Sequence, residues 1–297
     1  MLSSFYVLWA LLAQSGECPA LLARGRQAYE SRQFVVAAAE FERALAVCPN
    51  RAPILESLGQ AQLMARQLDR SIESFGQLLK LEAKNVMAHK LLGDALYLSA
   101  KEVEAETVIK AGLEIDPRHE PSLYALGRIY YQEKRYTEAA DQFQKVIDID
   151  ANNYRAHDNL ALCYDALYRD SDALRHFFKA LDLVMKAHPE YDWAHANLAD
   201  FYLKRGEYEK AFQLAAEAAE RNPGSARNLF LTGKALVNLG KLGLSVRWLT
   251  RACELDPGYS ESHYLLALVY RKLGKAEEAQ QHLEKFRILS QSPRTRR

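Results

Sequence analysis

Residues Tyr124 to Asp150 read YALGRIYYQEKRYTEAADQFQKVIDID, and this stretch decides the fold. Apolar residues recur every three or four positions on both sides of the charged break Glu133-Lys134-Arg135, which predicts two short amphipathic helices joined by a turn. Gly127 falls inside the first helix, where glycine costs about 1 kcal/mol relative to alanine. A glycine at such a position indicates that a second helix packs closely against it.

The same pattern returns along the chain with a period of 34 residues. The glycine position is filled in successive units by Gly25, Gly59, Gly93, Gly127, Ala161, Ala199, Gly233 and Ala267. A small residue stands 12 positions after each of the first four, at Ala37, Ser71, Ala105 and Ala139. A large apolar residue stands 16 positions after them, at Phe41, Phe75, Ile109 and Phe143. The small residues are expected to face one another across each pair of helices.

This pattern resembles the tetratricopeptide repeat, a helix–turn–helix unit of about 34 residues. The resemblance covers residues 18–293 in eight units, which begin at Cys18, Ala52, Val86, Glu120, Tyr154, Asp192, Ala226 and Ser260. It implies an all-α protein, a right-handed superhelical solenoid of about eight helical hairpins. The fifth unit carries four extra residues near His188–Tyr191, about one helical turn. A longer second helix and a longer following loop both accommodate them.

The two ends of the chain differ from the repeats. Residues 5–13, FYVLWALLA, are apolar and precede Ala13-Gln14-Ser15, a small-x-small cleavage pattern, so residues 1–15 resemble a signal peptide. No Lys or Arg precedes the apolar run, and an apolar cap on the first helix is the alternative. We expect an exported protein, periplasmic or secreted, if the signal is real, and a cytoplasmic one otherwise. Residues 294–297 form a short basic tail.

Motifs for chemistry are absent from the sequence. It holds no phosphate loop, zinc-spaced Cys/His set, nucleophile elbow or dinucleotide fingerprint. Four histidines share the fourth position of their units, His89, His157, His195 and His263. Equivalent positions of neighbouring units lie about 10 Å apart, too far for ligands of one ion. The net charge of +1 argues against a nucleic-acid binder. We therefore expect no enzyme, no cofactor, no metal site and no nucleic-acid partner.

The cysteines predict one conditional disulfide. Cys18 and Cys48 occupy positions 1 and 31 of the first unit, at the open end of one hairpin, which would favour a bridge in an exported protein. Packed helix axes lie about 8–10 Å apart, whereas a bridge needs Cα atoms within about 4.4–6.8 Å, so the helix ends would have to lean together. Cys163 and Cys253 are expected to be small buried residues.

In proteins of the family that this chain resembles, the first helices of the units line a concave groove that holds a peptide or a partner's segment. Mapping that surface gives as partner-binding residues Tyr124, Arg128, Tyr131, Asp158, Asn159, Asp165, Trp193, Asn197 and Asp200. The two asparagines are similar to an amide ladder that grips a peptide backbone. The aspartates favour a basic segment.

These residues predict a non-catalytic protein–protein interaction scaffold in an exported or envelope assembly, without a membrane span in the mature chain. The alternative is a substrate-presenting or regulatory subunit of an enzyme complex.

Overall fold

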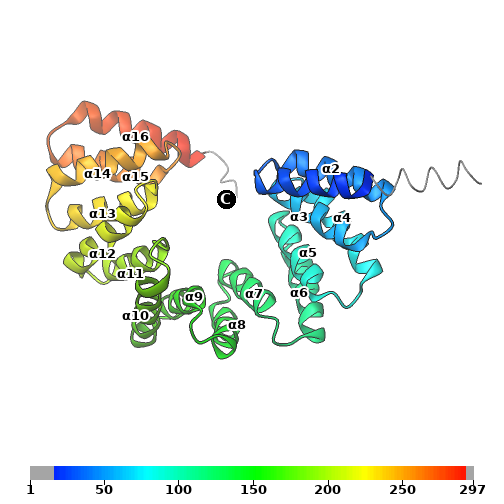
Figure 1. The fold of residues 1–297 in the computed structure, drawn as a ribbon. Coiled ribbons are helices and arrows are strands. Elements are labelled where there is room, and N and C mark those ends of the chain that lie inside the picture. Colours follow the sequence, from blue (N-terminus) through cyan, green and yellow to red (C-terminus); the bar gives the residue numbers. More distant parts are fainter. Residues whose placement is uncertain (1–16, 292–297) are drawn as a thin grey trace, which may run out of the picture. The chain divides into compact units, whose positions relative to one another are not determined.

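The computed structural model describes residues 17–291, which are helical with turns between the helices and contain no strand (Figure 1). The chain divides into two compact units, Met1–Ile149 and Asp150–Arg297, called here the N-terminal and the C-terminal unit. Both ends singled out in the sequence, residues 1–15 and 294–297, lie outside the described residues. None of the described helices is long and apolar enough to cross a membrane.

The N-terminal unit is a stack of four helical hairpins. The first consists of helical residues 17–30 and α2 (Phe34–Val47). The others pair α3 (Ala52–Met64) with α4 (Leu68–Leu81), α5 (Val86–Leu98) with α6 (Glu102–Ile115), and α7 (Glu120–Gln132) with α8 (Tyr136–Ile149). Each hairpin packs against the next through the contacts α2–α3, α4–α5 and α6–α7.

The C-terminal unit repeats this arrangement four times. Its hairpins pair α9 (Tyr154–Ala166) with α10 (Asp170–Ala187), α11 (Trp193–Lys204) with α12 (Tyr208–Arg221), α13 (Ala226–Asn238) with α14 (Leu242–Leu255), and α15 (Ser260–Lys272) with α16 (Ala276–Gln291). The predicted all-α solenoid of about eight helical hairpins is confirmed. The four extra residues of the fifth repeat lengthen its second helix, since α10 has 18 residues where α8, α12 and α14 have 14.

The glycine in the first helix of a repeat is required by close packing. A Cβ atom added to Gly127 would lie 2.9 Å from the ring of Phe143, and one added to Gly93 would lie 2.3 Å from Cγ1 of Ile109. Phe143 and Ile109 are fully buried, so neither can move aside. The second helix therefore presses its largest residue onto the glycine of the first, and this contact offsets the poor helix propensity of glycine.

The turn inside each hairpin places one residue in the left-handed backbone region. The last three repeats use glycine there, at Gly206, Gly240 and Gly274, with φ of 77°, 72° and 75°. The first five use other residues with φ between 58° and 63°, namely Arg32, Arg66, Ala100, Lys134 and Tyr168. All eight occupy the same position of the repeat.

A polar cluster joins the third and fourth hairpins. The Glu106 carboxylate of α6 accepts hydrogen bonds from Arg135 at 2.6 Å, Lys110 at 2.6 Å and the Tyr130 hydroxyl at 2.9 Å. The Arg135 guanidinium also stacks on the Tyr130 ring, 4.0 Å from its centroid. The hydrogen bond from Arg135 is the main cause that lowers the pKa of Glu106 to about 2.

Cys18 and Cys48 form a disulfide at the open end of the first hairpin. Their Cα atoms are 5.4 Å apart, because the two helix ends approach more closely than the helix axes do. The other two cysteines, Cys163 and Cys253, are buried thiols.

Candidate functional site

The first helices of the C-terminal repeats present the most distinctive surface. Helices α9, α11, α13 and α15 contact one another in that order, so their outward sides form one continuous strip. We call this strip the helix-A face. It carries two large aromatic residues that are strongly exposed, Trp193 at the start of α11 with 51% and Tyr264 on α15 with 44% of the residue accessible.

Arg227 links two helices across this face. Its guanidinium lies 4.9 Å from the centroid of the Trp193 indole, a cation–π contact between α13 and α11. It also donates a hydrogen bond of 2.8 Å to the amide oxygen of Asn197. The indole is thereby held in place although half of it stays accessible, and tryptophan and arginine are residue types enriched at binding hot spots.

A network of hydrogen bonds around the buried Asp158 holds Asn197, the residue to which Arg227 donates. Oδ2 of Asp158 accepts hydrogen bonds from the Asn197 amide at 2.8 Å and from the Tyr191 hydroxyl at 2.9 Å. Oδ1 of the same carboxylate is buried and has no hydrogen-bond partner among the described residues. Burial raises the pKa of Asp158 to about 6, against the lowering effect of its two donors. These hydrogen bonds link α9 to α11, and the bond from Arg227 links α11 to α13.

The two asparagines of the expected amide ladder both make hydrogen bonds within the protein. Asn197 is buried, and both ends of its amide are used within the protein, by Asp158 and Arg227. Asn159 is half-buried and donates to the backbone carbonyl of Arg155 one turn earlier, at 2.8 Å. Packing between adjacent repeats thus covers Asn197 and leaves neither end of its amide free for a partner's backbone.

The aspartates on this face are neutralised internally. Lys204 lies 3.0 Å from both Asp165 and Asp200, and Arg205 pairs with Asp165 at 2.8 Å. Asp158 is buried, as described above. Lys204 and Arg205 of the sixth repeat thus balance Asp165, and Lys204 also pairs with Asp200 in its own helix, which leaves these carboxylates little free charge for a basic segment.

Cations further along the face are not balanced in this way. Lys234, Arg271 and Lys272 form no ion pair with any of residues 17–291. Arg271 and Lys272 end α15 and are exposed, while Lys234 lies beside the Phe230 ring on α13, 5.9 Å from its centroid. The helix-A face beyond Trp193 therefore combines exposed aromatic area with unpaired positive charge.

The remaining predicted residues lie in the N-terminal unit, on α7. Arg128 is exposed. Tyr124 and Tyr131 are half-buried, and each meets a ring of α8 edge-on, Phe143 at 5.5 Å and Tyr136 at 5.4 Å between centroids. Both tyrosines therefore contribute to packing within their own hairpin.

The histidines in the fourth position pack within their own hairpins. Nδ1 of His157 lies 2.9 Å from Nδ1 of His176, and Nδ1 of His263 lies 3.0 Å from Nδ1 of His282. The sequence reasoning missed these pairs because it compared equal positions in neighbouring repeats. His176 and His282 share position 23 of their units, 19 residues after the first histidine, which is the signal that reveals both pairs.

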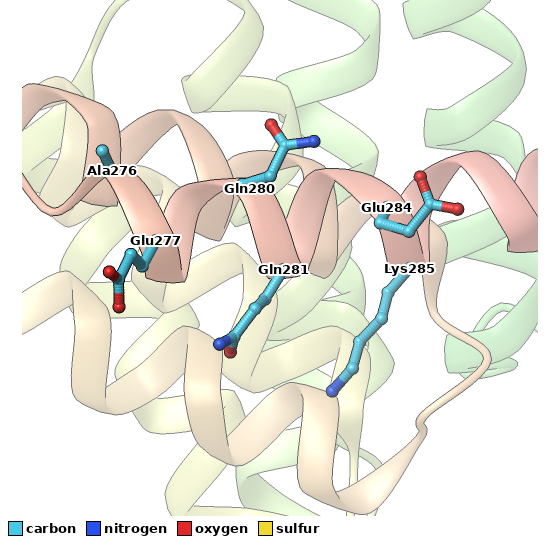
Figure 2. A pocket seen from close by; sticks show the side chains of 6 residues that line it. All are labelled: Ala276, Glu277, Gln280, Gln281, Glu284 and Lys285. Carbon is cyan, nitrogen blue, oxygen red and sulfur yellow. The ribbon is translucent and has the colours of Figure 1, made fainter.

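A hollow lies on the last helix and is formed by α16 alone. Figure 2 shows the six side chains that line it: Ala276, Glu277, Gln280, Gln281, Glu284 and Lys285. All come from one helix, and charged and amide groups dominate the lining. Because no second element closes this hollow, it is a weaker candidate than the helix-A face.

Comparison with known proteins agrees with the repeat architecture. Models described as tetratricopeptide repeats match residues 22–75, 57–120, 172–232 and 248–281, and one described as a TPR repeat matches residues 127–167. Tetratricopeptide repeat protein 8 of Caenorhabditis elegans is 24% identical over 222 residues, which are 75% of this chain and 42% of that protein. Lipopolysaccharide assembly protein B of Escherichia coli K12 is 24% identical over 230 residues, 75% of this chain and 59% of that protein. The chain thus spans about half the length of these relatives.

Solved structures share the fold. A tetratricopeptide repeat protein from Parabacteroides merdae superposes with a TM-score of 0.68 at 18% identity, over 86% of this chain and 99% of that one. The anaphase-promoting-complex hetero-tetramer Cut9–Hcn1 gives 0.68 at 13% identity, over 93% of this chain and 53% of that one. The helical hairpins, the glycine contacts and these matches together show that the chain belongs to the tetratricopeptide repeat family.

Proposed function

We propose that this chain is a non-catalytic scaffold whose C-terminal unit binds an acidic segment of a partner protein on the helix-A face. The observation that carries the proposal is the half-exposed Trp193 indole, held by Arg227 and followed by unpaired cations. An aromatic ring fixed in one orientation offers apolar area at a low cost in conformational entropy. Arginine beside it adds directional hydrogen bonds to a carboxylate.

Charge decides between an acidic and a basic partner. The carboxylates that would hold a basic segment are buried or already paired with Lys204 and Arg205. A basic segment would have to displace these pairs, whereas an acidic segment gains contacts with Lys234, Arg271 and Lys272 without breaking an ion pair among residues 17–291. Complementary charge of this kind also raises the rate of association.

We further propose that the protein acts in an exported assembly. The Cys18–Cys48 disulfide supports export, because such bridges persist in oxidising compartments. The name of one relative, lipopolysaccharide assembly protein B, refers to an envelope component and is compatible with the same location. N-terminal sequencing of the native protein tests this: an intact Met1 contradicts cleavage after residue 15.

The binding proposal is tested with synthetic peptides and the intrinsic fluorescence of the chain. In a Trp248→Phe background, Trp193 is the tryptophan that reports on the C-terminal unit. A library of twelve-residue peptides rich in Asp, Glu and aromatic residues is prepared, together with the same peptides in which Lys replaces each Asp and Glu. The binding of the two sets is compared. We expect acidic members to change the Trp193 emission and to bind less tightly as salt rises.

Matched variants locate the binding surface. Arg227→Ala and the charge reversal Lys234→Glu with Arg271→Glu should each weaken the best acidic peptide about tenfold or more, the effect of losing a hot-spot residue. Phe178→Ala on α10 removes an aromatic ring of similar exposure, 50%, from a second helix and should leave affinity unchanged. Equal binding of acidic and basic peptides, or equal losses in Phe178→Ala and the face variants, contradicts the proposal.

A further inference from the structure

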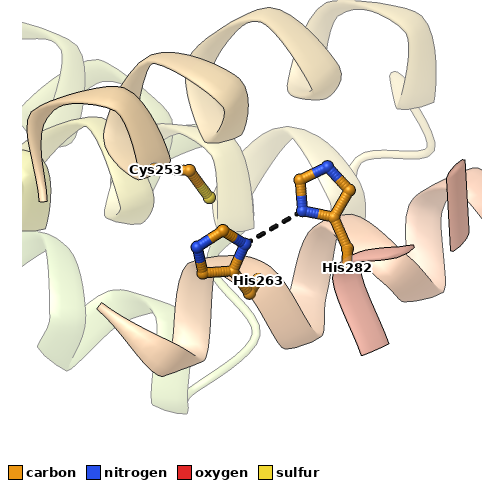
Figure 3. Close-up of side chains that lie close together, drawn as sticks. All are labelled: Cys253, His263 and His282. Carbon is orange, nitrogen blue, oxygen red and sulfur yellow. Dashed lines mark hydrogen bonds between the residues drawn. The ribbon is translucent and has the colours of Figure 1, made fainter. Parts of the chain in front are cut away.

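A side-chain cluster at the C-terminal end of the array has the composition of a metal site. Cys253 of α14, His263 of α15 and His282 of α16 each offer one ligand atom, and these atoms lie within 4.8 Å of one another (Figure 3). Cys253 and His263 are buried and His282 is half-buried. Figure 3 shows the cysteine sulfur directed toward the two imidazole rings, which come from the two helices of the last hairpin.

We propose that Cys253, His263 and His282 form a zinc site in which solvent supplies the fourth ligand. A thiolate and two imidazoles are the donor set that tetrahedral Zn²⁺ takes, with bonds of about 2.3 Å to sulfur and about 2.0–2.1 Å to nitrogen. Those bonds require about 3.3–3.6 Å between ligand atoms. The two Nδ1 atoms are 3.0 Å apart and have to separate by about 0.3 Å, and the widest pair in the cluster has to close by about 1 Å.

The surroundings prepare His263 as a ligand. The backbone carbonyl of Pro257 hydrogen-bonds its ring. The equivalent histidine of the fifth repeat, His157, shows the same contact from Nε2 to the carbonyl of Ala151 at 3.2 Å. A histidine that uses Nε2–H for a carbonyl keeps the Nδ1 lone pair for a metal, an arrangement found around most metal-bound histidines. Tyr270 stacks on the His282 ring, 5.7 Å between centroids, and limits its rotation.

Proton balance accompanies binding. Burial raises the pKa of the Cys253 thiol to about 11, so the free site holds S–H, and Zn²⁺ displaces that proton to solvent as the Zn–S bond forms. In the free site one Nδ1–H joins the two histidines. When both Nδ1 atoms bind zinc, the histidine that donated this hydrogen bond loses its proton from Nδ1 and carries one on Nε2, so its ring stays neutral. One proton is therefore released per zinc bound, and affinity rises with pH.

The chain contains its own control for the histidine pair. His157 and His176 occupy the same two positions three repeats earlier, with Nδ1 atoms 2.9 Å apart and rings stacked at 27°, against 29° for the last repeat. At the position of Cys253, the repeat before that pair has Ile147. The histidine pair thus occurs in two repeats as part of the packing between their helices, and the nearby Cys253 distinguishes the proposed site.

Zinc at this place would secure the end of the array. Helix α16 contains no buried residue, and within the described residues it packs mainly against α15. The site would tie α16 and α15 to α14 of the preceding repeat. Local opening of α16 would then require release of the metal.

The test uses the full chain after removal of metal with a chelator. Titration with Co²⁺, the spectroscopic substitute for zinc, should give thiolate-to-cobalt charge transfer in the near ultraviolet and tetrahedral d–d bands, saturating at one ion per chain and reversed by Zn²⁺. Two substitutions use residues that the sixth repeat has at the same positions, Ala219 and Leu214, and so preserve the fold. These are Cys253→Ala and His282→Leu, and each should weaken binding at least about 100-fold.

His176→Leu is the matched control and should leave the cobalt spectrum unchanged. As a second readout, amide exchange in α16 should slow about 100-fold when free Zn²⁺ is 100 times its dissociation constant. The proposal is overturned if the wild-type chain shows no thiolate charge transfer. It is equally overturned if Cys253→Ala keeps the affinity, or if His176→Leu abolishes it.

Discussion

Adding one methyl group to Gly93 should destabilise the chain, although the same change at Gly76 should stabilise it. Both glycines lie inside helices of the N-terminal unit, and alanine in a helix is favoured over glycine by about 1 kcal/mol. A Cβ at Gly76 meets no atom within 4 Å. That variant therefore keeps the full gain, and its free energy of unfolding should rise by about 0.5–1 kcal/mol.

At Gly93 the new Cβ would lie 2.3 Å from Cγ1 and 2.7 Å from Cδ1 of Ile109, with the Ala105 carbonyl oxygen at 3.4 Å. Ile109 is fully buried, so the two helices must separate, and overpacking of this kind costs about 1–3 kcal/mol. The helix propensity gain is common to both variants, so the difference between them isolates the packing cost.

Urea denaturation followed by circular dichroism measures that difference as a shift of the midpoint. If Gly93→Ala is as stable as Gly76→Ala, the close approach of α5 and α6 does not explain the glycine position.

Three other perturbations probe the disulfide and two carboxylates, the buried Asp158 and the half-buried Glu106. Cys48→Ser should lower the stability by about 3–4 kcal/mol for a bridge that spans 30 residues. Alkylation of the denatured, unreduced wild-type protein should label two of its four cysteines. Asp158 has a folded pKa raised from 3.8 to about 6, so the folded state binds an extra proton between these values. Its contribution to stability should grow by about 2 kcal/mol as the pH falls from 7 to 4, and it approaches about 3 kcal/mol only below the unfolded pKa. Asp158→Asn should lack this component, and identical pH profiles of urea midpoints would contradict the assignment. Glu106→Gln should cost about 1.5–3 kcal/mol at pH 7, since hydrogen bonds to a charged group are lost. This cost should disappear as the pH falls through the folded pKa of about 2, and a constant difference down to that pH argues against the Arg135 cluster.

The fold was predictable because its determinants recur locally. A glycine, a small residue 12 positions later and a large one 16 positions later define which two helix faces meet, and Gly127 with Phe143 shows that contact in the structure. The extra turn of the fifth repeat was not predictable in this way. Four residues fit a longer α10 or a longer loop equally well, and the contacts that Tyr191 makes with Tyr154 and Asp158 after the helix are not visible in the sequence.

The candidate site was less predictable, since its determinants lie between repeats. Asn197 is buried, and its amide bonds to Asp158 of the repeat before it and to Arg227 of the repeat after it. The sequence identified Trp193 as a surface residue and placed it on the correct helix. It did not reveal that Asp165 is balanced by Lys204 and Arg205, because such pairing depends on side-chain reach between two repeats.

The residue in the left-handed turn of each hairpin has a consequence for how the protein comes apart. A residue other than glycine in that conformation costs about 1–2 kcal/mol, and the N-terminal unit holds four of them, Arg32, Arg66, Ala100 and Lys134. The C-terminal unit holds one, Tyr168, and uses glycine in its other three turns. Strain is thus concentrated in the unit that also carries the disulfide, which keeps its first hairpin closed. Glycine placed in the turns of the N-terminal unit would stabilise that unit, and replacement of glycine in the later turns would destabilise the C-terminal unit. Such exchanges would decide which unit unfolds first under heat or mechanical load, without a change in the helix-A face.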